Sequence, residues 1–135
     1  MNVPDGAQAP PRVTIVAVDD EAEFTQTLAQ YFTPRGYTVH TALNGAAGIQ
    51  LVELHRPAVV LIDLKMPGID GDKALAEIRR INPKTQVIVI TAYSDEGRTR
   101  ERLLALGAFG HFEKPISSMR HLAEAVNQAA ALAAG

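Results

Sequence analysis

Five short apolar runs alternate along this chain with segments of helical spacing, and this alternation constrains the fold more than any other feature. Two of the runs, at residues 13–18 and 58–62, are almost entirely aliphatic, which is typical of strands covered on both faces of a parallel sheet. Alternating strands and helices favour right-handed crossovers, so the sequence predicts a doubly wound α/β fold. The five predicted parallel strands are residues 13–18, 38–42, 58–63, 86–91 and 110–113.

Apolar residues between these runs recur three or four positions apart, as on the buried face of a helix. The pairs and triplets are Phe24, Leu28 and Phe32; Ile49 and Val52; Leu75 and Ile78; Leu103 and Leu106; and Leu122, Val126 and Ala129. Asn44 and either Ser117 or Ser118 stand where helix N-caps are expected. The sequence therefore predicts five helices between and after the strands.

Length and composition indicate one independently folding domain. The chain has 135 residues, 47% of them apolar, and a net charge of -2, which leaves no basic field for nucleic acid or an anionic membrane. It contains no cysteine and no apolar run long enough to span a bilayer, so we expect a soluble, cytoplasmic protein. Residues 1–12, with three prolines, are expected to form a disordered leader, and residues 13–134 the domain.

Polar and charged residues follow four of the predicted strands. Asp19 and Asp20 end the first, Asp63 the third and Thr91 the fourth, and Lys114 follows the fifth. Ligands of open α/β sheets bind beyond the carboxyl ends of the strands, so we expect these five side chains to share one site.

The predicted chemistry of this site follows from its charges. Three clustered aspartates raise one another's pKa unless a cation offsets their repulsion, and Mg²⁺ suits a site of carboxylates, water and phosphate oxygens. Asp63 can then act as a carboxylate nucleophile and form an aspartyl phosphate. Lys114 and Thr91 can neutralise the phosphoryl oxygens.

Four segments resemble the receiver domains of two-component response regulators. The resemblance implies a flavodoxin-like (βα)5 fold with strand order 2-1-3-4-5, over most of the chain. It also implies a signalling switch, which assists its own phosphorylation and dephosphorylation but is not an enzyme. The matching segments are VAVDDE (16–21), LIDLKMPGIDG (61–71), VIVITAY (87–93) and GAFGHFEKPI (107–116).

The resemblance assigns a role to each site residue. Asp63 would accept a phosphoryl group from a phosphohistidine on a sensor histidine kinase or phosphotransfer protein. Mg²⁺ would be held by Asp20, Asp63 and the backbone carbonyl of Lys65, with Asp19 acting through water. The remaining two residues, Thr91 and Lys114, would contact the phosphoryl group.

The family's output surface comprises the fourth helix, fifth strand and fifth helix. It would meet an output domain, a protein partner or a second copy of the chain. Arg98, Arg100 and Arg102 fall on the fourth helix, where they form either a solvated face or part of that surface. No direct contact with nucleic acid or membrane is expected.

One position departs from the family pattern. Three residues before Lys114 the family usually has Tyr or Phe, which swings inward during switching, and this chain has His111. A histidine is polar and titratable, so the switch is expected to be weaker, shifted or sensitive to pH. Phe112 should point to the opposite face and cannot replace it.

Three other function classes are weighed against the switch. A phosphatase of the haloacid-dehalogenase type needs a second Asp two residues after its nucleophile, but Lys65 follows Asp63 at that spacing. A flavin binder needs a phosphate-binding loop, and the acidic residues 19–21 would repel a phosphate. The alternative that remains is a degenerate receiver acting as a phosphorylation-independent interaction module.

Overall fold

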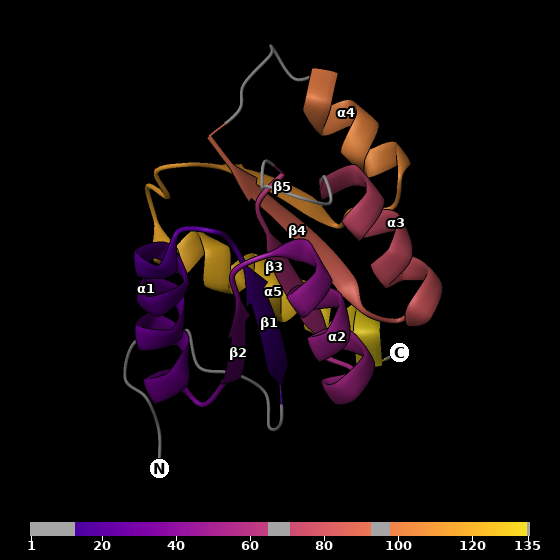
Figure 1. The fold of residues 1–135 in the computed structure, drawn as a ribbon. Helices are drawn as coiled ribbons and strands as arrows, with labels where there is room; N and C mark the ends of the chain where they lie inside the picture. The colour runs from indigo at the N-terminus through magenta and orange to yellow at the C-terminus, as the bar shows by residue number, and fades with distance from the viewer. Residues whose placement is uncertain (1–12, 65–70, 93–97, 135) are drawn as a thin grey trace.

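Five parallel strands form one sheet, and a helix follows each strand (Figure 1). The structure is a computed structural model that describes residues 13–64, 71–92 and 98–134. The strands are β1 (Thr14–Val18), β2 (Thr38–Ala42), β3 (Val59–Ile62), β4 (Gln86–Thr91) and β5 (Gly110–Glu113). The helices are α1 (Ala22–Phe32), α2 (Gly45–His55), α3 (Gly71–Ile81), α4 (Arg98–Ala105) and α5 (Met119–Ala134), with a short 3-10 helix η1 (Thr33–Arg35) after α1. Each predicted strand is confirmed to within one residue at either end.

The strand order is β2-β1-β3-β4-β5, which confirms the order that the family resemblance implies. Because every neighbouring pair is parallel, the carboxyl ends of all five strands meet at one edge of the sheet. The amino ends meet at the opposite edge. The topology therefore creates two distinct edges, and the predicted site residues belong to the first.

Helices cover both faces of the sheet and create two hydrophobic cores. α1 and α5 pack on one face through Leu28, Phe32 and Val126, all of which are buried. α2, α3 and α4 pack on the other face, where Val52 and Leu103 are among the buried side chains. Strand residues alternate between these cores, so every position of β3 is buried. This two-sided burial explains the nearly continuous aliphatic runs of the sequence.

Two predicted helix caps are present. The side chain of Asn44 accepts a hydrogen bond from the amide of Ala47 at 2.8 Å, and that of Ser118 accepts one from His121 at 3.2 Å. Ser118, rather than Ser117, is thus the capping serine of α5. No helix in the described part of the chain is both long enough and apolar enough to cross a membrane.

Gly48 allows α2 to approach β1 very closely. A Cβ atom built on Gly48 would lie 2.6 Å from one methyl carbon of Val18 and 3.0 Å from the other. Val18 is buried, and its carbonyl oxygen accepts a hydrogen bond from the amide of Asp63. The packing of this glycine therefore bears directly on the strand ends.

We predict that Gly48→Ala lowers the free energy of unfolding by about 1–2 kcal/mol, because the strain of overpacking exceeds the gain in helix propensity. Urea unfolding followed by circular dichroism measures this change. Gly110→Ala is the matched control, since a Cβ at Gly110 meets nothing within 4 Å. Equal losses in the two variants would contradict the proposed contact with Val18.

Candidate functional site

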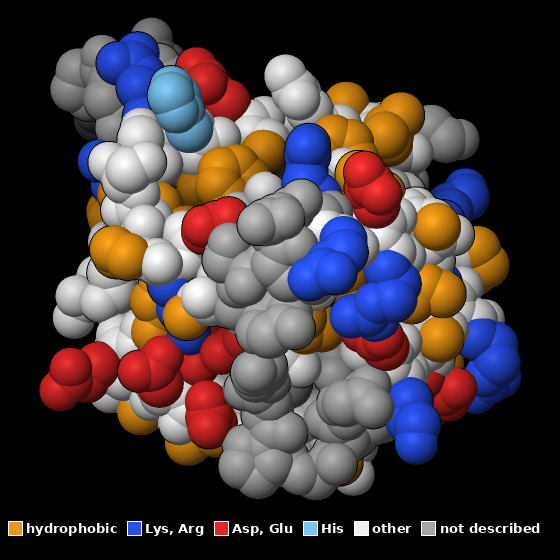
Figure 2. Space-filling model, turned by 90° about the horizontal axis from the view of Figure 1, so that it is seen from above, with side chains coloured by type: hydrophobic (Ala, Val, Ile, Leu, Met, Phe, Trp, Pro, Cys, Tyr) orange, Lys and Arg blue, Asp and Glu red, His pale blue; other side chains and the backbone are white. Residues whose placement is uncertain are grey.

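The predicted site residues do meet at the carboxyl edge of the sheet. Asp19 and Asp20 directly follow β1, Asp63 follows β3, Thr91 is the last residue of β4, and Lys114 directly follows β5. Figure 2 looks down on this side of the molecule, where acidic side chains gather towards α1 and basic ones towards α3 and α4. The edge is thus polarised, with its negative charge on the side of the first strand.

Lys114 is the central cation of the site. Its Nζ donates hydrogen bonds to Asp19 at 2.6 Å, to Glu21 at 2.8 Å and to Asp63 at 3.1 Å. Only 11% of the Lys114 side chain is exposed, so its ion pairs with the buried Asp19 and Asp63 are shielded from water, whereas Glu21 is exposed. Burial alone would lower the pKa of Lys114, but the three carboxylates outweigh it and raise the pKa. Lys114 is therefore charged at neutral pH.

Asp19 is buried beneath the edge. Burial raises its pKa above the ordinary value, although hydrogen bonds from Lys114 and from the backbone amide of Glu21 oppose this effect. The bond from the Glu21 amide, 2.9 Å long, lies at the start of α1. Asp19 thus accepts hydrogen bonds both from Lys114 and from the amide of Glu21, the N-cap residue of α1.

The three aspartates form a cluster with the donor set of a cation site. One carboxylate oxygen each from Asp19, Asp20 and Asp63 can be chosen so that all three lie within 4.8 Å of one another. Asp20 is exposed, whereas the other two are buried. Together with Glu21, the cluster has four carboxylates, and Lys114 supplies one ammonium. The formal charge of these five groups is therefore -3. Oxygen ligands with excess negative charge fit Mg²⁺.

Thr91 and His111 lie on the same face of the sheet. Thr91 pairs with Glu113 in the register of β4 and β5, and His111 pairs with Val89, two residues earlier. Side chains two residues apart on a strand share a face, so both point towards the side covered by α4. Thr91 is buried, and its carbonyl oxygen accepts a hydrogen bond from the Lys114 amide.

Two further predictions have different outcomes. Phe112 packs against the core beneath α1 and α5, which confirms that it points away from the face of His111. Lys65, whose backbone carbonyl is predicted to bind Mg²⁺, lies outside the described residues. Its role stays a prediction.

Sequence reasoning missed two partners of Lys114. Glu21 was noted only as part of an acidic run, yet it binds the ammonium directly. Phe24 lies below, with Lys114 Nζ 4.5 Å from the centroid of its ring, which adds a cation–π contact. One sequence feature could have identified these partners, namely the i,i+3 spacing of Glu21 and Phe24. This spacing places both side chains on the same side of the first turn of α1.

The sequence pattern of the response regulator receiver domain matches residues 15–127. The chain belongs to the response regulator receiver family. The match spans the elements from β1 into α5, and so includes every predicted site residue.

Curated relatives of this receiver differ in how much of their length the match covers. Sporulation initiation phosphotransferase F of Bacillus subtilis is 37% identical over 101 residues, which is 75% of this chain and 81% of the relative. Regulatory protein AtoC of Escherichia coli is 41% identical, also over 75% of this chain, but the receiver spans only 22% of AtoC. The similarity to AtoC therefore concerns its receiver segment and not the rest of that protein.

Solved structures show the same fold. A receiver domain protein from Clostridium thermocellum is 30% identical and superposes with a TM-score of 0.77, covering 88% of this chain and 94% of the other. A CheY-like receiver from Methanospirillum hungatei superposes with a TM-score of 0.83, covering 91% and 97%, at 24% identity. The latter likeness concerns the fold alone.

The electrostatics of the site give a stability prediction. In metal-free buffer at pH 7, Lys114→Met should lower the free energy of unfolding by about 2 kcal/mol, because the buried carboxylates lose their counter-charge. Without Lys114, the pKa of Asp19 should rise further, since its ionised form loses a hydrogen bond and an attraction. A raised carboxyl pKa destabilises the fold above that pKa, so the loss should shrink as the pH falls from 7 towards 4.

Urea unfolding at each pH measures this difference between wild type and variant. Lys84→Met is the matched control, because Lys84 is exposed and forms no ion pair with any described residue. A loss that is independent of pH would show that Lys114 stabilises the fold by packing rather than by charge.

Proposed function

We propose that this receiver is a phosphoryl-accepting switch, in which Asp63 takes a phosphoryl group from a phosphohistidine of a sensor histidine kinase or phosphotransfer protein. The observation that carries the proposal is the position of the Asp63 carboxylate. It lies at the end of a buried strand, beside two other aspartates and in contact with Lys114. The name of the relative from Bacillus subtilis, a phosphotransferase, agrees with this chemistry.

In the proposed transfer, a carboxylate oxygen of Asp63 forms a bond to phosphorus while the phosphorus–nitrogen bond of the donor histidine breaks. The donor nitrogen keeps the electron pair of that bond. Hydrolysis later returns Asp63 to its carboxylate form, with water supplying the oxygen of inorganic phosphate. The receiver therefore assists one phosphoryl transfer and the later hydrolysis of its own aspartyl phosphate, which is the behaviour of a switch rather than of an enzyme with its own substrate.

Two residues neutralise the transferred group in this scheme. Lys114 contacts Asp63 directly, so its ammonium can follow the phosphoryl oxygens once they arrive. Thr91 ends the strand beside β3 and can supply a hydroxyl donor from the same edge. Both groups act through charge and hydrogen bonding, which a phosphoryl transfer requires more than acid–base catalysis.

The acidic cluster fits Mg²⁺ as the cofactor. Asp19, Asp20 and Asp63 would hold it, with the carbonyl of Lys65 as a further ligand. When bound, the cation supplies positive charge to the phosphoryl oxygens. The formal charge of -3 at the site would otherwise repel a phosphorylated donor.

We predict that incubation with acetyl phosphate and Mg²⁺ adds one phosphoryl group to the wild-type chain, and that hydroxylamine removes it. Asp63→Asn should add none, because an amide is not a nucleophile at this centre. Intact-protein mass spectrometry measures the mass gain. Glu53→Gln, an exposed carboxylate of α2, is the control and should label normally. Labelling of Asp63→Asn would move the acceptor elsewhere, and absence of labelling in wild type would favour the interaction-module alternative.

Metal binding is predicted separately from phosphorylation. Asp20→Asn should weaken Mg²⁺ affinity roughly tenfold or more, because it removes one charged ligand of the cluster. Calorimetric or NMR titration with MgCl₂ measures the affinity. Glu23→Gln removes another exposed carboxylate, one turn away on α1, and should change it little. Equal affinities of the wild type and Asp20→Asn would disprove the assignment.

In the proposed switch, a conformational change that starts at Asp63 reaches the surface formed by α4, β5 and α5. Drawing Thr91 towards a phosphoryl group would vacate space on the face that it shares with His111. His111 is only partly exposed, with its Nε2 buried, and is the group proposed to fill that space. α4 packs on the same face through Leu103, and an ion pair between Arg102 and Asp72 ties it to α3. Arg102 is therefore part of an ion pair between α4 and α3.

This route predicts chemical-shift changes in α4 when beryllofluoride and Mg²⁺ mimic the phosphoryl group. The changes should be smaller in Thr91→Ala, and smaller in His111→Ala, because either variant interrupts the displacement. NMR spectra of the amides measure them. Thr38→Ala, an exposed threonine of the distant edge strand β2, should respond like wild type. Unchanged α4 shifts in Thr91→Ala would break the proposed route.

The unit that switches is proposed to comprise residues 13–134, with residues 1–12 as a leader outside it. Its partners would be the phosphohistidine donor and an output domain, a protein partner or a second copy on the α4, β5 and α5 surface. We place it in the cytoplasm, which the absence of cysteine supports.

A further inference from the structure

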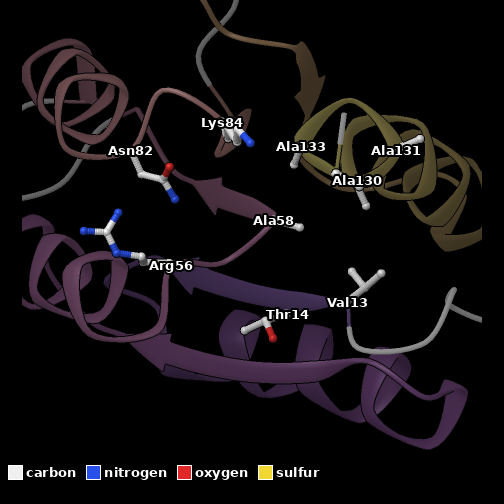
Figure 3. A pocket seen from close by; sticks show the side chains of 10 residues that line it. Val13, Thr14, Arg56, Ala58, Asn82, Lys84, Ala130, Ala131 and Ala133 are labelled. Carbon is white, nitrogen blue, oxygen red and sulfur yellow. The ribbon is translucent and has the colours of Figure 1, made fainter.

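A pocket of about 670 Å³ opens at the amino edge of the sheet, opposite the acidic cluster (Figure 3). It lies between the first residues of β1, the segments that lead into β3 and β4, and the last turn of α5. No residue of the Asp63 site lines it. The lining residues are Val13, Thr14, Arg56, Ala58, Asn82, Lys84, Ala130, Ala131, Ala133 and Ala134.

The polar side of this pocket is basic. Arg56 and Asn82 lie on the side away from α5, and Lys84 lies above them in Figure 3. Arg56 and Lys84 are both exposed, and neither forms an ion pair with another described residue. No acidic side chain is among the described residues that line the pocket. Two uncompensated cations at one cavity favour an anionic group.

The opposite side of the pocket is apolar. Four alanines from the end of α5 and Val13 form it, and Ala130 is buried while Ala131 is exposed. Small side chains leave room beside the helix, and a cavity of this volume falls in the range that holds small organic ligands. The pocket therefore offers an apolar surface a short distance from positive charge.

The backbone at Arg56 supports a role for its side chain. Arg56 caps the carboxyl end of α2 with a φ of 44°, in the left-handed region where glycine is favoured. An arginine there is strained by about 1 kcal/mol relative to glycine. The arginine at this turn provides a guanidinium that a glycine would not.

We propose that this pocket binds a small organic anion, with a carboxylate or phosphate head and an apolar body of about six carbons. Lys84 would hold the head, and the alanines of α5 would cover the body. The Arg56 guanidinium, which is turned away from α5 in Figure 3, would join Lys84 by a change of side-chain rotamer. The acidic carboxyl edge repels such an anion, whereas the amino edge attracts it. The proposal does not depend on phosphorylation of Asp63, so its test and that of the switch can fail independently.

The test is an NMR titration of the wild-type chain of 135 residues with four probes: hexanoate, hexyl phosphate, hexan-1-ol and acetate. We expect saturable shifts at the amides of residues 56, 58, 84 and 130–134 with hexanoate, hexyl phosphate or both. Hexan-1-ol lacks the charge and acetate lacks the body, so each should bind at least roughly threefold more weakly than the better anion. Comparing hexanoate with hexyl phosphate identifies the preferred head.

Charge variants complete the test. Arg56→Gln and Lys84→Gln should each weaken binding of the better anion, by roughly threefold or more, because each removes one cation. Arg120→Gln, at the opposite end of α5, is the control and should bind like wild type. Equal affinity for the anions and hexan-1-ol, unsaturable shifts, or no effect of the pocket variants would each overturn the proposal. Contacts between residues 1–12 and the α5 alanines in ligand-free spectra would also overturn it, by assigning the pocket to the chain's own leader.

Discussion

One ammonium group, that of Lys114, joins the carboxylates that follow two different strands and organises the carboxyl edge of the sheet. It binds Asp19 after β1, Asp63 after β3 and Glu21 at the start of α1. A single cation cannot neutralise these groups together with Asp20, so the site keeps an excess of negative charge. That excess makes a divalent cation a fitting cofactor, and the contact with Asp63 would place Lys114 beside the incoming phosphoryl group of the proposed transfer. The proposed cation binding and the proposed phosphoryl acceptance thus depend on one arrangement.

The sequence predicted the fold and the composition of this site because both follow from local patterns. Apolar runs and helical spacing identify the elements, and a parallel sheet brings all carboxyl ends to one edge. Asp63, Thr91 and Lys114 needed only to be recognised as strand-end residues. The side of the sheet that Phe112 faces follows equally from alternation along β5. The strand order came from the resemblance to a family, since local patterns do not say which strands are neighbours.

Contacts between separate elements could not be predicted in this way. The sequence pattern identified Lys114 as a site residue but not its contacts with Glu21 and Phe24. The direction of a long side chain depends on the packing around it, which the pattern does not show. His40 of β2 and His55 of α2 stack with ring centroids 3.7 Å apart, although no pattern relates them. Burial, followed by repulsion from His55, lowers the pKa of His40. The pocket at the amino edge was equally invisible, since it arises where turn residues meet the end of α5.

The acidic cluster at the carboxyl edge and the basic pocket at the amino edge bear opposite charge, yet they lie far apart. β3 connects them, from Ala58 at the pocket to Asp63 at the acidic cluster, and an extended strand of that length spans about 17 Å. Fixed charges in water are screened over about 8 Å at physiological ionic strength. The distance is about twice that screening length, so an anion at the amino edge changes the field at Asp63 little through the solvent. A stronger influence of one site on the other would need a displacement of the packed strands and helices between them.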